Sequence, residues 1–118
     1  MKKFEDLEVW QLGHDLVLGV YDVTARYPDE ERFGLVSQMR RAGVSVPANL
    51  AEGCDRGTDR ELARSCDIAS GSAAELDYYC RLSHDLGYLT APVFGRLQGN
   101  TRTLRAKLHG LSAYLRGR

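Results

Sequence analysis

From Leu62 to Leu115, apolar and small side chains recur at alternating steps of four and three residues, the spacing of one face of an α-helix. One segment opens at Thr58 and has the seam Leu62, Cys66, Ala69, Ala73, Leu76, Cys80 and Ser83. The next starts near Thr90 and has Leu97, Thr101, Leu104, Leu108, Leu111 and Leu115. The small residues in the first seam predict close approach of a neighbouring helix.

Two earlier segments carry the same periodicity less regularly. From about Phe4 to Tyr27 we expect a packed face of Leu7, Trp10, His14, Val17, Tyr21 and Thr24, widened by Leu16, Val20 and Val23. From about Glu31 to Arg56 the stripe is Leu35, Met39, Ala42, Val46 and Leu50. Pro47 predicts a kink or a break there, because proline removes a helical hydrogen bond. No segment alternates like a strand, so residues 1–118 are predicted to form one all-α domain, an antiparallel up-and-down four-helix bundle.

Turn signals separate the last three segments. Gly57 is a plausible stop for the second helix, since glycine accepts the left-handed conformation that often ends a helix. Thr58 and Glu61 then form a Thr-x-x-Glu capping box, which predicts the start of the third helix.

Composition excludes several classes of protein. The 118 residues are 43% hydrophobic and 27% charged with zero net charge, an ordinary globular balance. No apolar run approaches the roughly 20 residues of a membrane span, and the acids in MKKFEDLEVW interrupt any signal-peptide core, so we expect a cytoplasmic protein. The chain has an odd number of cysteines, and none of them forms a CxxC pair: Cys54, Cys66 and Cys80. This pattern predicts reduced thiols rather than disulfides or a zinc site.

Catalytic motifs are incomplete. A di-iron bundle needs a Glu-x-x-His pair from each of two helices, and the sequence has no such pair. Glu5-x-x-Glu8 supplies half of a pyrophosphatase motif, but the next acidic pair, Glu52-x-x-Asp55, comes far along the chain. No Gly-rich phosphate loop or nucleophile elbow is present. We therefore expect a protein that is not an enzyme and needs no metal or cofactor.

Four sequence blocks resemble one protein family, in order and over nearly the whole chain. They are FEDLEVW from Phe4 to Trp10, Arg32-Phe33-Gly34-Leu35, SQMRRAGVSVPANLAEG from Ser37 to Gly53, and Leu86-Gly87-Tyr88-Leu89. The chain resembles the four-helix-bundle proteins encoded in intervening sequences of bacterial 23S rRNA genes. This resemblance implies a ring-like homopentamer whose biochemical role is poorly defined and which has no catalytic residues.

A related branch of that family looks like the accessory proteins of diversity-generating retroelements. The resemblance implies that such proteins bind nucleic acid and partner a reverse transcriptase. The zero net charge of this chain departs from the strongly basic character of that branch.

Basic residues gather in the last segment, since residues 91–118 contain six Lys and Arg, Arg118 included, and no acid. One hypothesis is a nucleic-acid site made of Arg96, Arg102, Arg105, Lys107, His109 and Arg116. Four of these, Arg102, Arg105, His109 and Arg116, share one helical stripe that could track a phosphate backbone. The alternative is a solvated face, or ion pairing with the acids of the third segment, Asp59, Glu61, Asp67, Glu75, Asp77 and Asp85, in the same or a neighbouring subunit.

A second polar group consists of Arg40, Arg41, Ser45, Asn49 and Glu52. Its structural interpretation is a hydrogen-bonded network that fixes the register of helices or subunits. Its functional interpretation is a binding site at Pro47, where a backbone carbonyl is freed.

Several apolar side chains lie off the main stripes. Leu12, Leu18, Val36 and Phe94 are predicted to line a subunit interface. Trp10 and His14 are expected in the core, with base stacking as the alternative role of Trp10. The first functional hypothesis is thus a non-enzymatic homo-oligomer. The second is an RNA- or DNA-binding module that uses the last helix. One form of this second hypothesis adds a reverse transcriptase as the protein partner.

Overall fold

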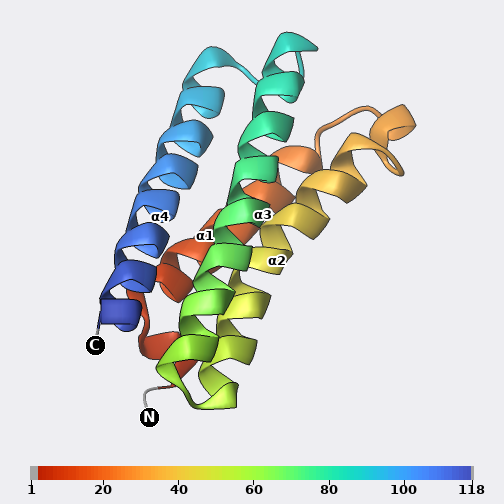
Figure 1. The fold of residues 1–118 in the computed structure, drawn as a ribbon. Helices are drawn as coiled ribbons and strands as arrows, with labels where there is room; N and C mark the ends of the chain where they lie inside the picture. Colours follow the sequence, from red (N-terminus) through yellow and green to blue (C-terminus); the bar gives the residue numbers. More distant parts are fainter. Residues whose placement is uncertain (1–2, 118) are drawn as a thin grey trace.

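The fold is a bundle of four long helices. A computed structural model describes residues 3–117, none of which lies in a strand. The helices are α1 (Glu8–Thr24), α2 (Leu35–Arg56), α3 (Asp59–Asp85) and α4 (Ala91–Gly117), with short 3₁₀ helices η1 (Phe4–Asp6) and η2 (Asp29–Glu31) before α1 and α2. Figure 1 shows successive helices running in opposite directions along a body 46 Å long. Because each helix packs on its sequence neighbours and α4 returns to α1, the predicted up-and-down bundle is confirmed.

The predicted stripes of the last three helices form the core. Every seam residue of α3 is buried, from Leu62 to Ser83, and so is every stripe residue of α2. In α4 the stripe is buried except for Leu111, which is partly buried, and Ser112 joins it. The free thiols of Cys54, Cys66 and Cys80 all lie in this interior.

The predicted packed face of α1 is confirmed for Leu16, Val20, Val23 and Thr24, but it is wrong for His14 and Tyr21. The buried residues of α1 are Val9, Gly13, Leu16, Val20, Val23 and Thr24. Apart from Thr24, the expected leading stripe lies on the flank, where His14 and Tyr21 are exposed and Trp10 is half-buried. The error arises because apolar residues cover both the buried face of α1 and its flank toward α2.

Helix α2 begins at Leu35, later than predicted, because η2 occupies Asp29–Glu31. It passes through Pro47 without breaking. Close packing surrounds this proline: a Cβ on Gly13 of α1 would lie 2.9 Å from Val46 Cγ1 and 3.6 Å from Pro47 Cδ. The absence of a side chain at Gly13 therefore lets α1 lie directly against the proline-containing turn of α2.

The turn from α2 to α3 follows the predicted signals. Gly57 has φ 85°, and the Thr58 hydroxyl accepts a hydrogen bond of 3.1 Å from the Glu61 amide. One turn before this corner, a Cβ on Gly53 would lie 2.3 Å from Ser65 Oγ and 2.6 Å from Ser65 Cβ. The helices α2 and α3 therefore approach closely where both have small residues, Gly53 and Ser65.

No helix in residues 3–117 is long and apolar enough to cross a membrane.

Candidate functional site

The predicted basic stripe of α4 runs along its seam with α3, where acids of α3 face it. Arg116 pairs with Asp67 at 2.6 Å, and the Ser112 hydroxyl, which also receives an N–H from Arg116, donates to Asp67 at 2.9 Å. The hydrogen bond from Arg116 is the main reason that the pKa of Asp67 lies below its ordinary value. Further along the seam Arg102 lies 3.4 Å from Asp77. Ion pairing with the third helix, one of the sequence-based alternatives, therefore holds for Asp67 and Asp77.

The middle of the seam differs from its ends. Here His109 Nε2 lies 3.2 Å from Ser70 Oγ, and Arg105 is half-buried with its Nε atom lacking a hydrogen-bond partner. Ala74 occupies the position of α3 between Ser70 and Asp77. Within residues 3–117 Arg105 forms no ion pair, whereas His109 is one of the smaller electrostatic causes of the lowered pKa of Asp67.

The remaining two predicted basic residues lie on the other side of α4. Lys107 Nζ contacts Glu8 Oε1 of α1 at 3.0 Å. Arg96 is exposed, with no ion pair within residues 3–117. The structure thus brings together four of the six predicted residues, and Arg118 lies outside the described residues.

The second polar group separates into three parts. Ser45 Oγ lies 2.8 Å from Ser72 Oγ of α3, and Asn49 Nδ2 donates to Ser45 Oγ at 2.9 Å, which links α2 to α3. Arg41 and Glu52 are exposed and outside this link, with Glu52 paired to Arg56 at 3.1 Å.

Arg40 turns the other way, toward α1. Its Nε donates to Thr24 Oγ1 at 2.9 Å, and its guanidinium carbon lies 4.3 Å from the centre of the Tyr21 ring. Arg40 thus belongs to the α1–α2 side of the bundle, whereas Ser45 and Asn49 belong to the α2–α3 side.

An apolar surface follows the outer side of the α1–α2 pair. Leu18 is 56% exposed, Tyr21 44% and Val44 41%. We call these three residues the apolar edge. It continues toward η1 through His14, whose ring stacks on Trp10 with centroids 4.9 Å apart. Sequence reasoning named Leu18 for an interface but missed Tyr21 and Val44, since it assigned Tyr21 to the core.

The other residues predicted for a subunit interface do not share this exposure. Val36 is 8% exposed and packs in the core, so that prediction is wrong. Leu12 and Phe94 are partly buried against the core. Leu12 of α1 lies near Asn100 and Thr103 of α4, and the Phe94 ring of α4 stacks on His84 of α3. Neither side chain therefore belongs to the outer side of the α1–α2 pair.

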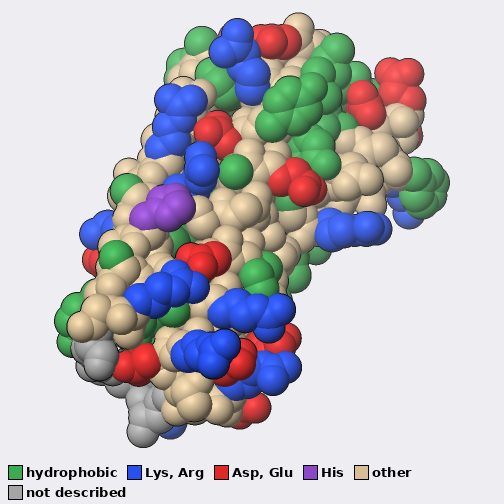
Figure 2. Space-filling model, viewed as in Figure 1, with side chains coloured by type: hydrophobic (Ala, Val, Ile, Leu, Met, Phe, Trp, Pro, Cys, Tyr) green, Lys and Arg blue, Asp and Glu red, His purple; other side chains and the backbone are tan. Residues whose placement is uncertain are grey.

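A second apolar surface covers the end of α3 that leads to the α3–α4 turn. Tyr78 is 60% exposed and Leu86 50%, while Tyr79 and Leu82 are half-buried beside them. We call these four residues the α3 patch. Figure 2 shows hydrophobic side chains gathered over this upper part of the molecule. Neither ring of the adjacent pair Tyr78 and Tyr79 is fully buried.

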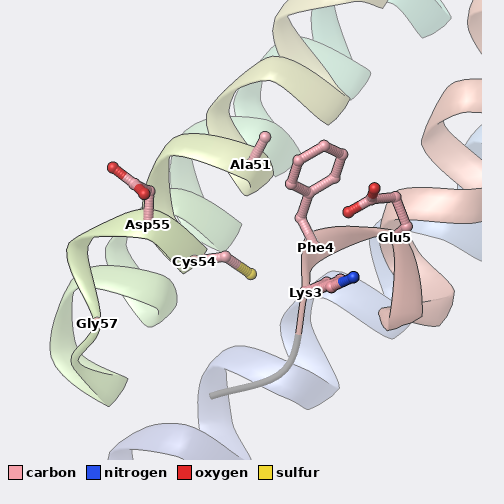
Figure 3. A pocket seen from close by; sticks show the side chains of 7 residues that line it. All are labelled: Lys3, Phe4, Glu5, Ala51, Cys54, Asp55 and Gly57. Atoms are coloured by element: carbon pink, nitrogen blue, oxygen red, sulfur yellow. The ribbon is translucent and has the colours of Figure 1, made fainter.

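A hollow of about 600 Å³ opens between η1 and the last turns of α2. In Figure 3 the Phe4 ring points toward Ala51 and the Cys54 sulfur lies at the inner wall, while Asp55 points away. Burial raises the pKa of the Cys54 thiol, which opposes formation of a nucleophilic thiolate. Among residues 3–117 no group of three His, Cys, Asp or Glu side chains is placed to hold a metal.

These features define a class: a small all-α bundle with stripes of charged and apolar residues on its surface and open hollows between its helices. The chain belongs to the 23S rRNA-intervening sequence protein family, whose model matches residues 5–110. Its fold is similar to that of a protein with unknown function from the S23 ribosomal protein family of Bacteroides thetaiotaomicron, with a TM-score of 0.78. The two are 18% identical, and the match covers 88% of this chain and 97% of the other. No curated protein matches the sequence.

Proposed function

We propose that this protein is a non-enzymatic building block that assembles with copies of itself into a closed ring, with five copies as the family resemblance implies. The apolar edge is the observation that carries the proposal. Leu18 and Tyr21 of α1 and Val44 of the neighbouring α2 are each more than 40% exposed. Exposed apolar side chains that gather on one surface are typical of protein interfaces.

The energetics favour an interface that covers more than the edge alone. Complete burial of a large apolar side chain contributes about 1.5–3 kcal/mol, and these three are already half covered. Association costs about 4–15 kcal/mol because each partner loses translational and rotational freedom. A stable ring therefore needs apolar surface from both partners at each contact, and the α3 patch adds a comparable amount.

Light scattering coupled to size-exclusion chromatography tests the proposal on the full chain at micromolar concentration. We expect a mass that is a multiple of the 13.2 kDa chain, five-fold for the pentamer. A mass of one chain would refute the assembly. The proposal places the protein in the cytoplasm, a reducing compartment where its three free thiols persist.

A second candidate function is binding of RNA or DNA through the α3–α4 seam, with a reverse transcriptase as an accompanying partner. It is favoured by the middle of the seam, where Arg105 forms no ion pair within residues 3–117 and its Nε has no hydrogen-bond partner there. Arg102 and Arg116 already neutralise acids of α3, so they contribute less free charge. In a ring this weak site is repeated, and multivalency raises its affinity.

Fluorescence anisotropy with a labelled structured RNA, at low and moderate salt, tests this candidate. We expect binding that weakens steeply as salt rises and that is lost in Arg105→Ala. The matched control is Arg26→Ala, an exposed arginine of α1 that pairs with Asp22 at 3.8 Å. Absence of binding at low salt would refute the candidate, and equal loss in both variants would exclude the seam as the site.

A further inference from the structure

We infer that a hollow between α1 and α4 receives an arginine side chain of a partner polypeptide. The hollow has a volume of about 270 Å³ and is lined by Leu12, Asp15 and Leu16 of α1 and by Asn100 and Thr103 of α4. It is smaller than a typical small-molecule pocket of about 300–1,000 Å³, which favours one long side chain over a whole ligand. The inference does not depend on the proposed ring, because no lining residue belongs to the apolar edge or to the α3 patch.

Three acids lie in a row along α1, and one of them is unmatched. Glu8, Asp15 and Asp22 recur every seven residues, which places them on one side of the helix. Glu8 is paired with Lys107 of α4 at 3.0 Å, and Asp22 is paired with Arg26 of its own helix at 3.8 Å. The exposed carboxylate of Asp15, between these two, forms no ion pair or hydrogen bond with another side chain of residues 3–117.

Helix α4 supplies no cation at the level of Asp15. The residues of α4 that line the hollow, Asn100 and Thr103, are uncharged. One turn of α4 before the hollow, Arg96 is exposed and forms no ion pair with Asp15. One turn after the hollow, Lys107 is already paired with α1. The carboxylate of Asp15 is therefore available to a cation from outside the chain.

The lining of the hollow matches both the polar and the apolar part of an arginine side chain. A guanidinium has five N–H donors and no acceptor, and the hollow offers it acceptors on the Asp15 carboxylate, the Asn100 amide and the Thr103 hydroxyl. Its planar fork binds a carboxylate through two parallel hydrogen bonds, a geometry that a lysine ammonium lacks. Leu12 and Leu16 supply apolar surface for the aliphatic stem, which arginine buries while its charged head stays near water.

Nuclear magnetic resonance of the isotope-labelled full chain tests the inference, because the side-chain amide of Asn100 reports directly on the hollow. The probe is a capped peptide, Gly-Ser-Arg-Ser-Gly, and the same peptide with lysine in place of arginine is its comparison. We expect the arginine peptide to shift the Asn100 amide signal saturably, and the lysine peptide to bind more weakly. In Asp15→Asn the dissociation constant should rise by at least about ten-fold, because the charged acceptor is removed.

Two further variants make the test specific. Asp22→Asn is the matched control, since it removes the same charge from the same helix outside the hollow, and it should bind as the wild type does. Thr103→Arg, at an exposed position on the α4 wall, supplies the missing cation from within the chain and should abolish binding. The inference would be overturned by a wild type that does not bind, by unchanged binding in Asp15→Asn, or by equal loss in Asp22→Asn. Tighter binding of agmatine, a free alkyl guanidine, than of the peptide would assign the hollow to a small cation instead.

Discussion

Substitution of Gly53 by alanine tests a close contact between α2 and α3. Gly53 lies in α2 where Ser65 of α3 approaches it, and an added Cβ would lie 2.3 Å from Ser65 Oγ and 2.6 Å from Ser65 Cβ. The same Cβ would lie 3.4 Å from the Cα atom of Leu62, so the backbone of α3 limits how far Ser65 can retreat. Alanine at this position must therefore push α2 and α3 apart.

Two opposing effects determine the expected magnitude. Alanine is favoured over glycine inside a helix by about 1 kcal/mol. Overpacking of a well-packed contact costs typically about 1–3 kcal/mol, and the two short distances at Ser65 place Gly53 at the upper end of that range. We expect Gly53→Ala to lower the free energy of unfolding by about 1–2 kcal/mol.

Urea denaturation followed by circular dichroism, at one fixed protein concentration, measures this change. Gly99→Ala in α4 is the matched control, because nothing lies within 4 Å of its added Cβ. There helix propensity acts alone, and the free energy of unfolding should rise by up to about 1 kcal/mol. Adding Ser65→Gly to Gly53→Ala removes both clashing atoms and should recover part of the loss.

The reasoning would be refuted if Gly53→Ala were as stabilising as Gly99→Ala. That result would mean that α2 and α3 separate at no cost and that the close approach contributes nothing to packing. A loss that Ser65→Gly does not relieve would place the strain elsewhere in the contact.

Three further predictions concern a helix cap, an ion pair and the buried thiols. Thr58→Ala removes the hydroxyl that caps α3 and should cost about 1 kcal/mol in urea denaturation, whereas Thr58→Ser should retain most of it. Because the folded-state pKa of Asp67 is lowered, chiefly by Arg116, its stabilising effect is present above the unfolded pKa of about 4 and is lost as pH falls through the folded value. The stability gap between wild type and Asp67→Asn should therefore narrow on acidification, and a constant gap would contradict the pairing. Burial raises the pKa of Cys66 to about 11 and that of Cys80 to about 12, so mass spectrometry after iodoacetamide treatment should find both unmodified in the folded protein and alkylated in urea.

Much of the fold could be predicted from the sequence because α2, α3 and α4 each bury one face and expose the others. Their apolar residues then recur with the helical period, and the period alone selects the buried stripe. The predicted seam of α3 is buried throughout for this reason. The turn at Gly57 and Thr58 is equally local, since a left-handed residue and a capping hydroxyl act within one helical turn.

The candidate sites were less predictable because they depend on how helices face one another. A helical wheel places Arg102, Arg105, His109 and Arg116 on one stripe but says nothing of α3. Only packing shows that Asp77 and Asp67 neutralise the ends of that stripe while Arg105 forms no ion pair within residues 3–117.

The sequence by itself determined that this chain forms helices, where they begin and end to within a few residues, and which stripe three of them bury. The tertiary structure decided which face of α1 enters the core, because both candidate faces are apolar; the face that enters places Gly13 directly against Val46 and Pro47. That choice leaves Leu18 and Tyr21 exposed. Periodicity is a property of one helix, whereas an interface depends on the apolar surface that remains after all four helices have packed.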